Sequence, residues 1–120
     1  MHSSDGLFDH LNRRLPATLE FLREMVGINS YTGNPEGVNR VGELTAAAFA
    51  PLGFKAEFVQ AHNPAWGRHL VLTRAGSTGR SMAMVSHLDT VFPPEEEDRN
   101  DFRWRKEGDR IYGPGTHDIK

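Results

Sequence analysis

The sequence of 120 residues contains no cysteine. This absence excludes disulfide bonds, thiolate zinc ligands and cysteine nucleophiles, so any bound metal must be held by histidine and carboxylate side chains. An excess of positive charge is also missing, because the formal net charge is -2. The overall field of the protein would therefore attract neither a nucleic acid nor an anionic membrane, and we expect no partner of either class.

Long apolar runs are missing as well. None approaches the length of a membrane-spanning helix, and the first residues lack the basic segment and apolar core of a signal peptide. We therefore expect a cytoplasmic location. The hydrophobic content of 38% and charged content of 25% are ordinary for a globular protein, and the length suffices for one small domain with a modest core.

Apolar residues recur at spacings of three and four in two segments, which predicts two amphipathic helices. Pro16 interrupts the first segment, residues 7–28, where it either kinks one helix or stands in the first turn of a helix that starts near Leu15. We favour the second, with a frayed or separate short helix before it. The second helix is expected to follow Asn34 as N-cap, with Pro35 at its first position, and to end before Gly53. We expect the first helix to bury an apolar stripe consisting of Leu7, Phe8, Leu11, Leu15, Leu19, Leu22, Met25 and Val26.

Three strands and a hairpin are predicted after the helices. Residues 54–60 alternate between apolar and polar side chains and form a half-exposed strand, and residues 69–74 form the next. The apolar residues of 81–86 indicate a strand buried on both faces, as a helix-covered sheet requires. Residues 102–106 and 110–112 flank a turn with a glycine, which predicts a hairpin. The sequence therefore predicts an α/β fold.

A histidine and an aspartate follow the third predicted strand directly. Residues two apart on a strand project to the same side, so His87 and Asp89 would emerge together at its C-terminal end, where open α/β sheets usually build their sites. An imidazole and a carboxylate at this spacing can act as a metal ligand and its orienting partner. The motif alone is weak, because a chance H-x-D in such a chain has odds of roughly one in ten. A strand-end histidine beside a turn aspartate is the favoured alternative for the motif alone.

A second candidate group stands near the end of the sequence. Gly113 and Gly115 bracket Pro114, and this tight turn would place Asp118 accurately, because glycine permits close backbone approach and proline removes freedom. Taken alone, a turn with a capping aspartate is again the simpler interpretation.

Other polar residues are interpreted as surface. The acidic run within 93–98 could attract a metal, but adjacent carboxylates on an extended loop diverge, so a solvated loop is favoured. His62 and His69 lie at a loop and at a strand edge, and solvated histidines are the commoner interpretation there.

The order of these motifs resembles that of the M20 family of metallopeptidases, which includes the glutamate carboxypeptidase, acetylornithine deacetylase and succinyl-diaminopimelate desuccinylase groups. The resemblance is carried by Ser-His-Leu-Asp-Thr-Val at 86–91 and Ile-Tyr-Gly-Pro-Gly-Thr-His-Asp-Ile-Lys at 111–120, and residues 31–37 support it. Gly-Pro-Gly is most similar to the glutamate carboxypeptidase branch. His117 stands where the family usually has a smaller residue, and we do not assign it as a ligand.

The resemblance implies a metal-dependent hydrolase with two zinc ions, or Co²⁺ or Mn²⁺ in their place, that cleaves the amide bond of a small peptide or N-acyl amino acid. By this resemblance His87 binds one metal, Asp118 bridges both, and Asp89 has a catalytic role in supporting His87. Residues 1–120 would form the N-terminal portion of a zinc-exopeptidase-like, three-layer catalytic domain. The full-length parent could form a homodimer.

The remaining ligands and the general-base glutamate of the family have no counterpart in this sequence. We therefore expect residues 1–120 to be the first piece of a longer enzyme and to be inactive alone. The alternative from another class is a small, non-catalytic α/β module that binds a metal or a partner.

Overall fold

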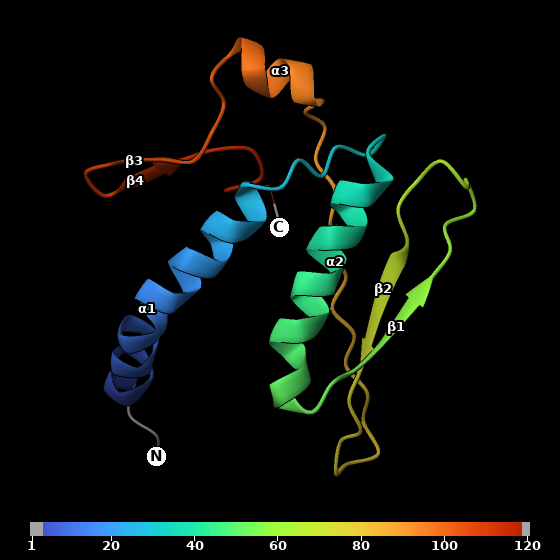
Figure 1. Cartoon of the computed structure of the whole chain (residues 1–120). Helices are drawn as coiled ribbons and strands as arrows, with labels where there is room; N and C mark the ends of the chain where they lie inside the picture. Colours follow the sequence, from blue (N-terminus) through green and yellow to red (C-terminus); the bar gives the residue numbers. More distant parts are fainter. Residues whose placement is uncertain (1–3, 119–120) are drawn as a thin grey trace.

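Helices form the first half of the chain and short strands follow, in the computed structural model that describes residues 4–118 (Figure 1). The elements in chain order are α1 (Ser4–Val26), α2 (Pro35–Phe49), the 3-10 helix η1 (Ala50–Leu52), β1 (Lys55–Val59), β2 (His69–Thr73), α3 (Pro94–Arg99), β3 (Arg105–Glu107) and β4 (Arg110–Tyr112). β1 pairs antiparallel with β2, and β3 with β4. The predicted α/β class is confirmed. Ile119 and Lys120 of the second motif lie outside the described residues.

The second helix begins and ends as its sequence predicts. The Asn34 side chain accepts a hydrogen bond from the Gly37 amide at 3.3 Å, and Pro35 occupies the first helical position. A 3-10 turn closes the helix, and Gly53 follows it with φ of 84°, a left-handed conformation that glycine adopts without strain. Both ends of this helix are formed by contacts between residues a few positions apart, so the local sequence is enough to predict them.

The two pieces predicted around Pro16 are wrong, because α1 is one continuous helix with Pro16 inside it. A proline within a helix leaves the carbonyl four residues earlier without its usual donor. Here that carbonyl belongs to Asn12, which is exposed, so water can satisfy it. The helix therefore continues past the proline.

The predicted burial of the first stripe is also wrong for most of its length. Met25 and Val26 are buried, whereas Leu7, Phe8, Leu11 and Leu15 are 49–64% exposed. The C-terminal half of α1 approaches the rest of the molecule (Figure 1), and its residues from Leu15 to Arg23 line a shallow hollow with Trp104 and Ile111. The radius of gyration is 16.6 Å, against about 13.6 Å for a compact domain of this length. The chain thus leaves apolar surface uncovered.

The strand predicted at 81–86 does not form. This segment runs as irregular chain behind α2 (Figure 1), and Met82, Met84 and Val85 are 89%, 89% and 94% exposed. A strand buried on both faces needs neighbouring strands for its backbone groups and cover for its side chains. Among residues 4–118, β2 pairs with β1 and no strand pairs with 81–86. Residues 81–86 have the apolar side chains of a buried strand, but residues 4–118 contain no neighbouring strand to pair with them.

The acidic segment at 93–98 is a helix and not the extended loop that we predicted. Pro94 takes the first helical position of α3, and three glutamates occupy its first turn. Carboxylates are favourable at this end of a helix, where the dipole is positive. The hairpin is confirmed: Glu107 pairs with Arg110, and Gly108 turns the chain with φ of 61°.

The small core has two parts: α2 packs on the β1–β2 hairpin, and the end of α1 packs on the turn at Gly113. A side chain at Gly42 of α2 would contact Phe58 of β1 and Leu88, so this glycine lets both segments pack closely on the helix. The buried apolar residues are Met25, Val26, Val38, Val41 and Ala61. Within residues 4–118, no helix combines the length and hydrophobicity that crossing a bilayer requires.

Gly37 holds the loop between α1 and α2 against the start of α2. An added Cβ would lie 1.8 Å from the carbonyl oxygen of Asn29, which is backbone and cannot move aside cheaply. We predict that Gly37→Ala lowers the free energy of unfolding by about 2 kcal/mol or more, measured by urea denaturation.

The matched control is Gly6→Ala, because nothing lies within 4 Å of a Cβ at Gly6 in α1. This change should be neutral or stabilise by up to about 1 kcal/mol. An unchanged urea midpoint for Gly37→Ala would contradict the close approach.

Candidate metal centre

A parallel backbone bridge ties the loop after α1 to the segment that follows 81–86. The Thr90 amide donates to the Ser30 carbonyl at 2.8 Å, and the Thr32 amide donates to the Thr90 carbonyl at 3.0 Å. Ser30 is fully buried and Thr90 is 6% exposed, so both hydrogen bonds are shielded from water. The bridge fixes the position of Asp89, which directly precedes Thr90.

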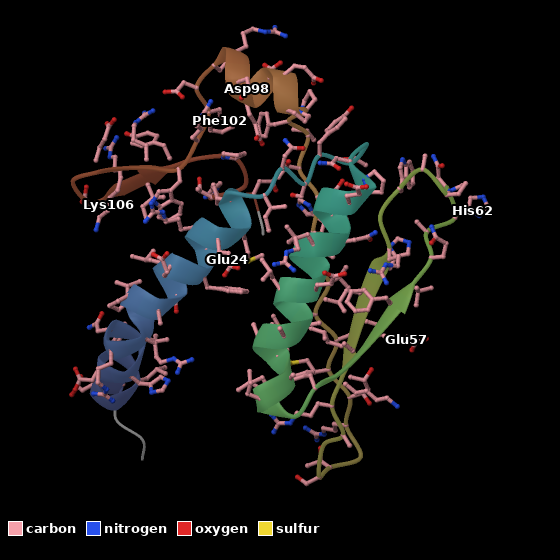
Figure 2. The ribbon with its side chains drawn as sticks, in the orientation of Figure 1. Glu24, Glu57, His62, Asp98, Phe102 and Lys106 are labelled. Atoms are coloured by element: carbon pink, nitrogen blue, oxygen red, sulfur yellow. The ribbon has the colours of Figure 1, made fainter. Side chains whose placement is uncertain are left out.

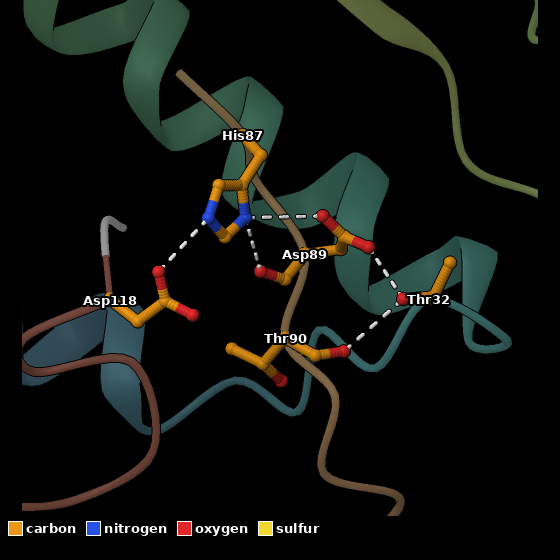
Figure 3. A network of polar contacts seen from close by, with 5 residues as sticks. All are labelled: Thr32, His87, Asp89, Thr90 and Asp118. Atoms are coloured by element: carbon orange, nitrogen blue, oxygen red, sulfur yellow. Dashed lines mark hydrogen bonds and ion pairs between the residues drawn. The ribbon is translucent and has the colours of Figure 1, made fainter.

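His87 and Asp89 lie side by side, as their spacing predicts, although no strand carries them. His87 Nδ1 lies 2.9 Å from the backbone carbonyl oxygen of Asp89 and 3.3 Å from its Oδ1 (Figure 3). A carbonyl oxygen only accepts hydrogen bonds, so Nδ1 carries a proton in this contact. Nε2 therefore faces the opposite direction as the outward nitrogen of the ring.

Asp118 approaches that outward nitrogen. Its Oδ1 lies 3.3 Å from His87 Nε2, across a separation of 31 residues (Figure 3). The turn before it is built by the Gly-Pro-Gly motif: Pro114 is fully buried, and Gly115 has φ of 79°. A Cβ at Gly113 would lie 2.8 Å from Val26, so the turn packs on the end of α1. The structure thus brings together all three residues that the sequence singled out.

The surroundings of His87 favour its charged form. The backbone carbonyl of Asp89 raises the pKa of His87 above its ordinary value, partial burial opposes this, and the Asp118 carboxylate raises the pKa further by hydrogen bond and charge. The side chains of His87, Asp89 and Asp118 are 43%, 34% and 81% exposed, so solvent screens these charges. The site thus presents two carboxylates to one imidazole at an open surface.

The donor atoms of this pair fit part of a zinc site. A tetrahedral zinc ion with nitrogen and oxygen ligands at about 2.0–2.2 Å holds those two atoms about 3.4 Å apart. The observed separation of 3.3 Å between His87 Nε2 and Asp118 Oδ1 matches this value. Within residues 4–118, however, no group of three or more His, Asp or Glu side chains is arranged to hold a metal ion. The pair could supply two ligands at most, and a complete centre needs more.

Other candidate ligands lie elsewhere. Figure 2 shows His62 on the loop between β1 and β2 and Asp98 on α3, each at an outer edge of the molecule. His69 is exposed on β2, and His117 is exposed beside Asp118. Among the described residues, none of these side chains completes a metal-binding group with His87 and Asp118.

Thr32 also belongs to the site, although its sequence pattern predicts no role for it. Its hydroxyl donates to Asp89 Oδ2 at 2.5 Å and also lies 3.3 Å from the Thr90 carbonyl oxygen (Figure 3). Thr32 lies within the stretch 31–37 that supports the family resemblance, but we assigned it no role. The contact spans 57 residues and depends on the register of the backbone bridge, so no local pattern indicates it.

This geometry defines an imidazole–carboxylate pair of the type found at metal centres. No family model matches the sequence. Carboxypeptidase G2 from Pseudomonas sp. (strain RS-16) is similar to it, with 32% identity over 114 residues that make up 95% of this chain. The aligned region is 27% of that protein, so the chain spans about a quarter of the length of this relative.

The raised pKa of His87 gives a prediction for the metal-free chain. We expect His87 to titrate above its ordinary value of about 6.5 in a histidine NMR titration, because Asp89 and Asp118 favour its charged form. Since the folded pKa is raised, this contribution to stability is fully present below the unfolded pKa and is lost as pH rises through the folded pKa.

Asp118→Asn should lower the pKa of His87, because it removes a carboxylate from Nε2. Asp109→Asn, on the exposed turn between β3 and β4, is the matched control and should leave it unchanged. A His87 pKa that does not respond to Asp118→Asn would contradict the contact.

Proposed function

We propose that this chain supplies part of the metal centre of an M20-type metallopeptidase or amidohydrolase. In this proposal His87 and Asp118 are zinc ligands and Asp89 supports His87. The observation that carries it is the 3.3 Å approach of His87 Nε2 to Asp118 Oδ1, from two motifs that stand far apart in the sequence. The similarity of nearly the whole chain to part of a carboxypeptidase supports it independently.

Each of the three side chains has a distinct task. The backbone carbonyl of Asp89 accepts the hydrogen bond from His87 Nδ1–H, and its carboxylate lies beside the same nitrogen. This leaves the Nε2 lone pair directed at the ligand position. Asp118 offers two carboxylate oxygens, and its high exposure leaves both accessible to cations. Bound zinc ions would acidify a water molecule and stabilise the negative charge that develops on the carbonyl oxygen of the substrate.

The substrate class follows from the same proposal. We propose a small peptide or an N-acyl amino acid as substrate, with Zn²⁺ as the metal and Co²⁺ or Mn²⁺ as substitutes. The other metal ligands and a general-base glutamate would come from further segments of a longer, cytoplasmic and dimeric parent. The aligned region is 27% of the carboxypeptidase, so a parent of similar length would have room for these further ligands.

A chimeric enzyme tests the function. Residues of this chain replace the 114 aligned residues of carboxypeptidase G2, and hydrolysis of a carboxypeptidase substrate is measured with and without a chelator. We predict chelator-sensitive hydrolysis that falls more than about 100-fold on His87→Ala or Asp118→Ala, because each change removes a ligand. Asp89→Asn should cost about 10–100-fold, as loss of an orienting partner does.

His62→Ala is the matched control, since His62 is an exposed histidine far from the pair (Figure 2). It should retain full hydrolysis. A folded chimera whose hydrolysis is insensitive to His87→Ala would contradict the assigned ligand, as would a folded, metal-loaded chimera with no hydrolysis.

A further inference from the structure

The Asp89 carboxylate connects two side chains rather than one. Its Oδ1 lies 3.3 Å from His87 Nδ1, and its Oδ2 accepts a hydrogen bond from the Thr32 hydroxyl (Figure 3). Thr32, Asp89 and His87 therefore form a continuous chain of polar contacts that ends at Nε2 and Asp118. A carboxylate held at one oxygen cannot rotate freely about its last torsion, so the other oxygen keeps its direction.

We propose that Thr32 is a positioning residue, whose hydroxyl fixes the rotation of the Asp89 carboxylate and so holds His87 in the tautomer with its proton on Nδ1. Nε2 then keeps a lone pair directed toward Asp118. The inference rests on the proposed function only where it treats His87 as a metal ligand.

The backbone gives Thr32 a defined place from which to act. Its own amide donates to the Thr90 carbonyl, one residue after Asp89. On the other side, the Asn34 amide donates to the Tyr31 carbonyl at 2.7 Å, just before α2 begins. The Thr32 hydroxyl is thus tied both to the start of α2 and to the segment that carries Asp89.

The size of the expected effect follows from a second acceptor at Nδ1. The backbone carbonyl of Asp89 lies 2.9 Å from Nδ1 and favours the same tautomer without help from Thr32. Loss of the Thr32 hydroxyl should therefore weaken the preference for the Nδ1–H tautomer and not abolish it. We expect the tautomer ratio to fall about tenfold, as for the loss of one charge-assisted hydrogen bond.

The test uses the 120-residue chain with the Asp118→Ala substitution, ¹⁵N-labelled histidine and no metal, at a pH where His87 is neutral. The substitution is needed because the Asp118 carboxylate, 3.3 Å from Nε2, would otherwise accept a hydrogen bond from Nε2–H and favour that tautomer. Long-range ¹H–¹⁵N correlation distinguishes the protonated ring nitrogen from the bare one. In this background the chain with Thr32 and the Thr32→Ser variant, which keeps the hydroxyl, should both show the Nδ1–H tautomer. Thr32→Val, which keeps the shape but lacks the hydroxyl, should shift His87 toward the Nε2–H form.

Thr45→Val is the matched control. The Thr45 hydroxyl bonds to the Val41 carbonyl within α2, so its loss removes a hydroxyl of the same kind away from the site. This variant should leave the tautomer unchanged. A folded Thr32→Val chain with the wild-type tautomer would overturn the inference, and so would an equal shift in Thr32→Ser.

A second variant covers the case in which Thr32→Val fails to fold. Asp89→Asn breaks the same chain of contacts one step closer to His87 and should produce at least as large a tautomer shift; no shift would overturn the inference. Because these spectra contain no metal, they test the role of Thr32 separately from the role of His87 as ligand. A Thr32-dependent tautomer in a chain whose His87 binds no metal would support the positioning role and contradict the proposed function.

Discussion

The backbone pairing of Thr90 with the loop after α1 is the constraint on which the site depends. The Thr90 amide donates a hydrogen bond to Ser30, and the Thr90 carbonyl accepts one from Thr32. These two bonds join segments about 60 residues apart in the sequence, at a place from which water is excluded. This register sets Asp89 beside the Thr32 hydroxyl and turns His87 outward. The Gly-Pro-Gly turn, packed on the end of α1, then brings Asp118 to the same place. The geometry of the site is therefore a property of backbone pairing and turn packing, and it does not require the strand that the sequence predicts before it.

The charges at the site explain how a proton and a metal ion would compete there. The backbone carbonyl of Asp89 raises the pKa of His87 most, and the carboxylates of Asp118 and Asp89 raise it further, so without a cation the second proton of His87 partly balances the two negative charges. A metal ion needs the Nε2 lone pair, so it must displace that proton, and metal affinity should rise with pH through the pKa of His87. The Nδ1 proton stays on His87 and is donated to Asp89 in both states. The contacts of Nδ1 with Asp89 are therefore the same with and without a metal ion. Only Nε2 changes, because it holds either a proton or the metal.

Local chemistry explains which parts of the fold the sequence could predict. Asn34 caps α2 and Gly108 turns the β3–β4 hairpin through contacts within a few residues, so both predictions are confirmed. Pro16 and residues 81–86 depend on surroundings: water satisfies the helix around the proline, and no strand in residues 4–118 pairs with the apolar segment. The approach of Asp118 to His87 was expected only from the order of the motifs. Thr32 escaped notice because its contact with Asp89 depends on a register that no periodicity encodes.

Localising a bound metal on the chain tests most directly whether His87 and Asp118 form part of a metal centre. Paramagnetic Co²⁺ is titrated into the ¹⁵N-labelled chain, and line broadening is followed residue by residue. We expect weak binding, because two ligands do not complete a tetrahedral site, with broadening centred on His87 and Asp118 and lost in His87→Ala. Broadening centred on His62, His69 or the acidic turn of α3 would contradict this assignment. Tight, stoichiometric binding would instead favour a self-sufficient metal-binding module.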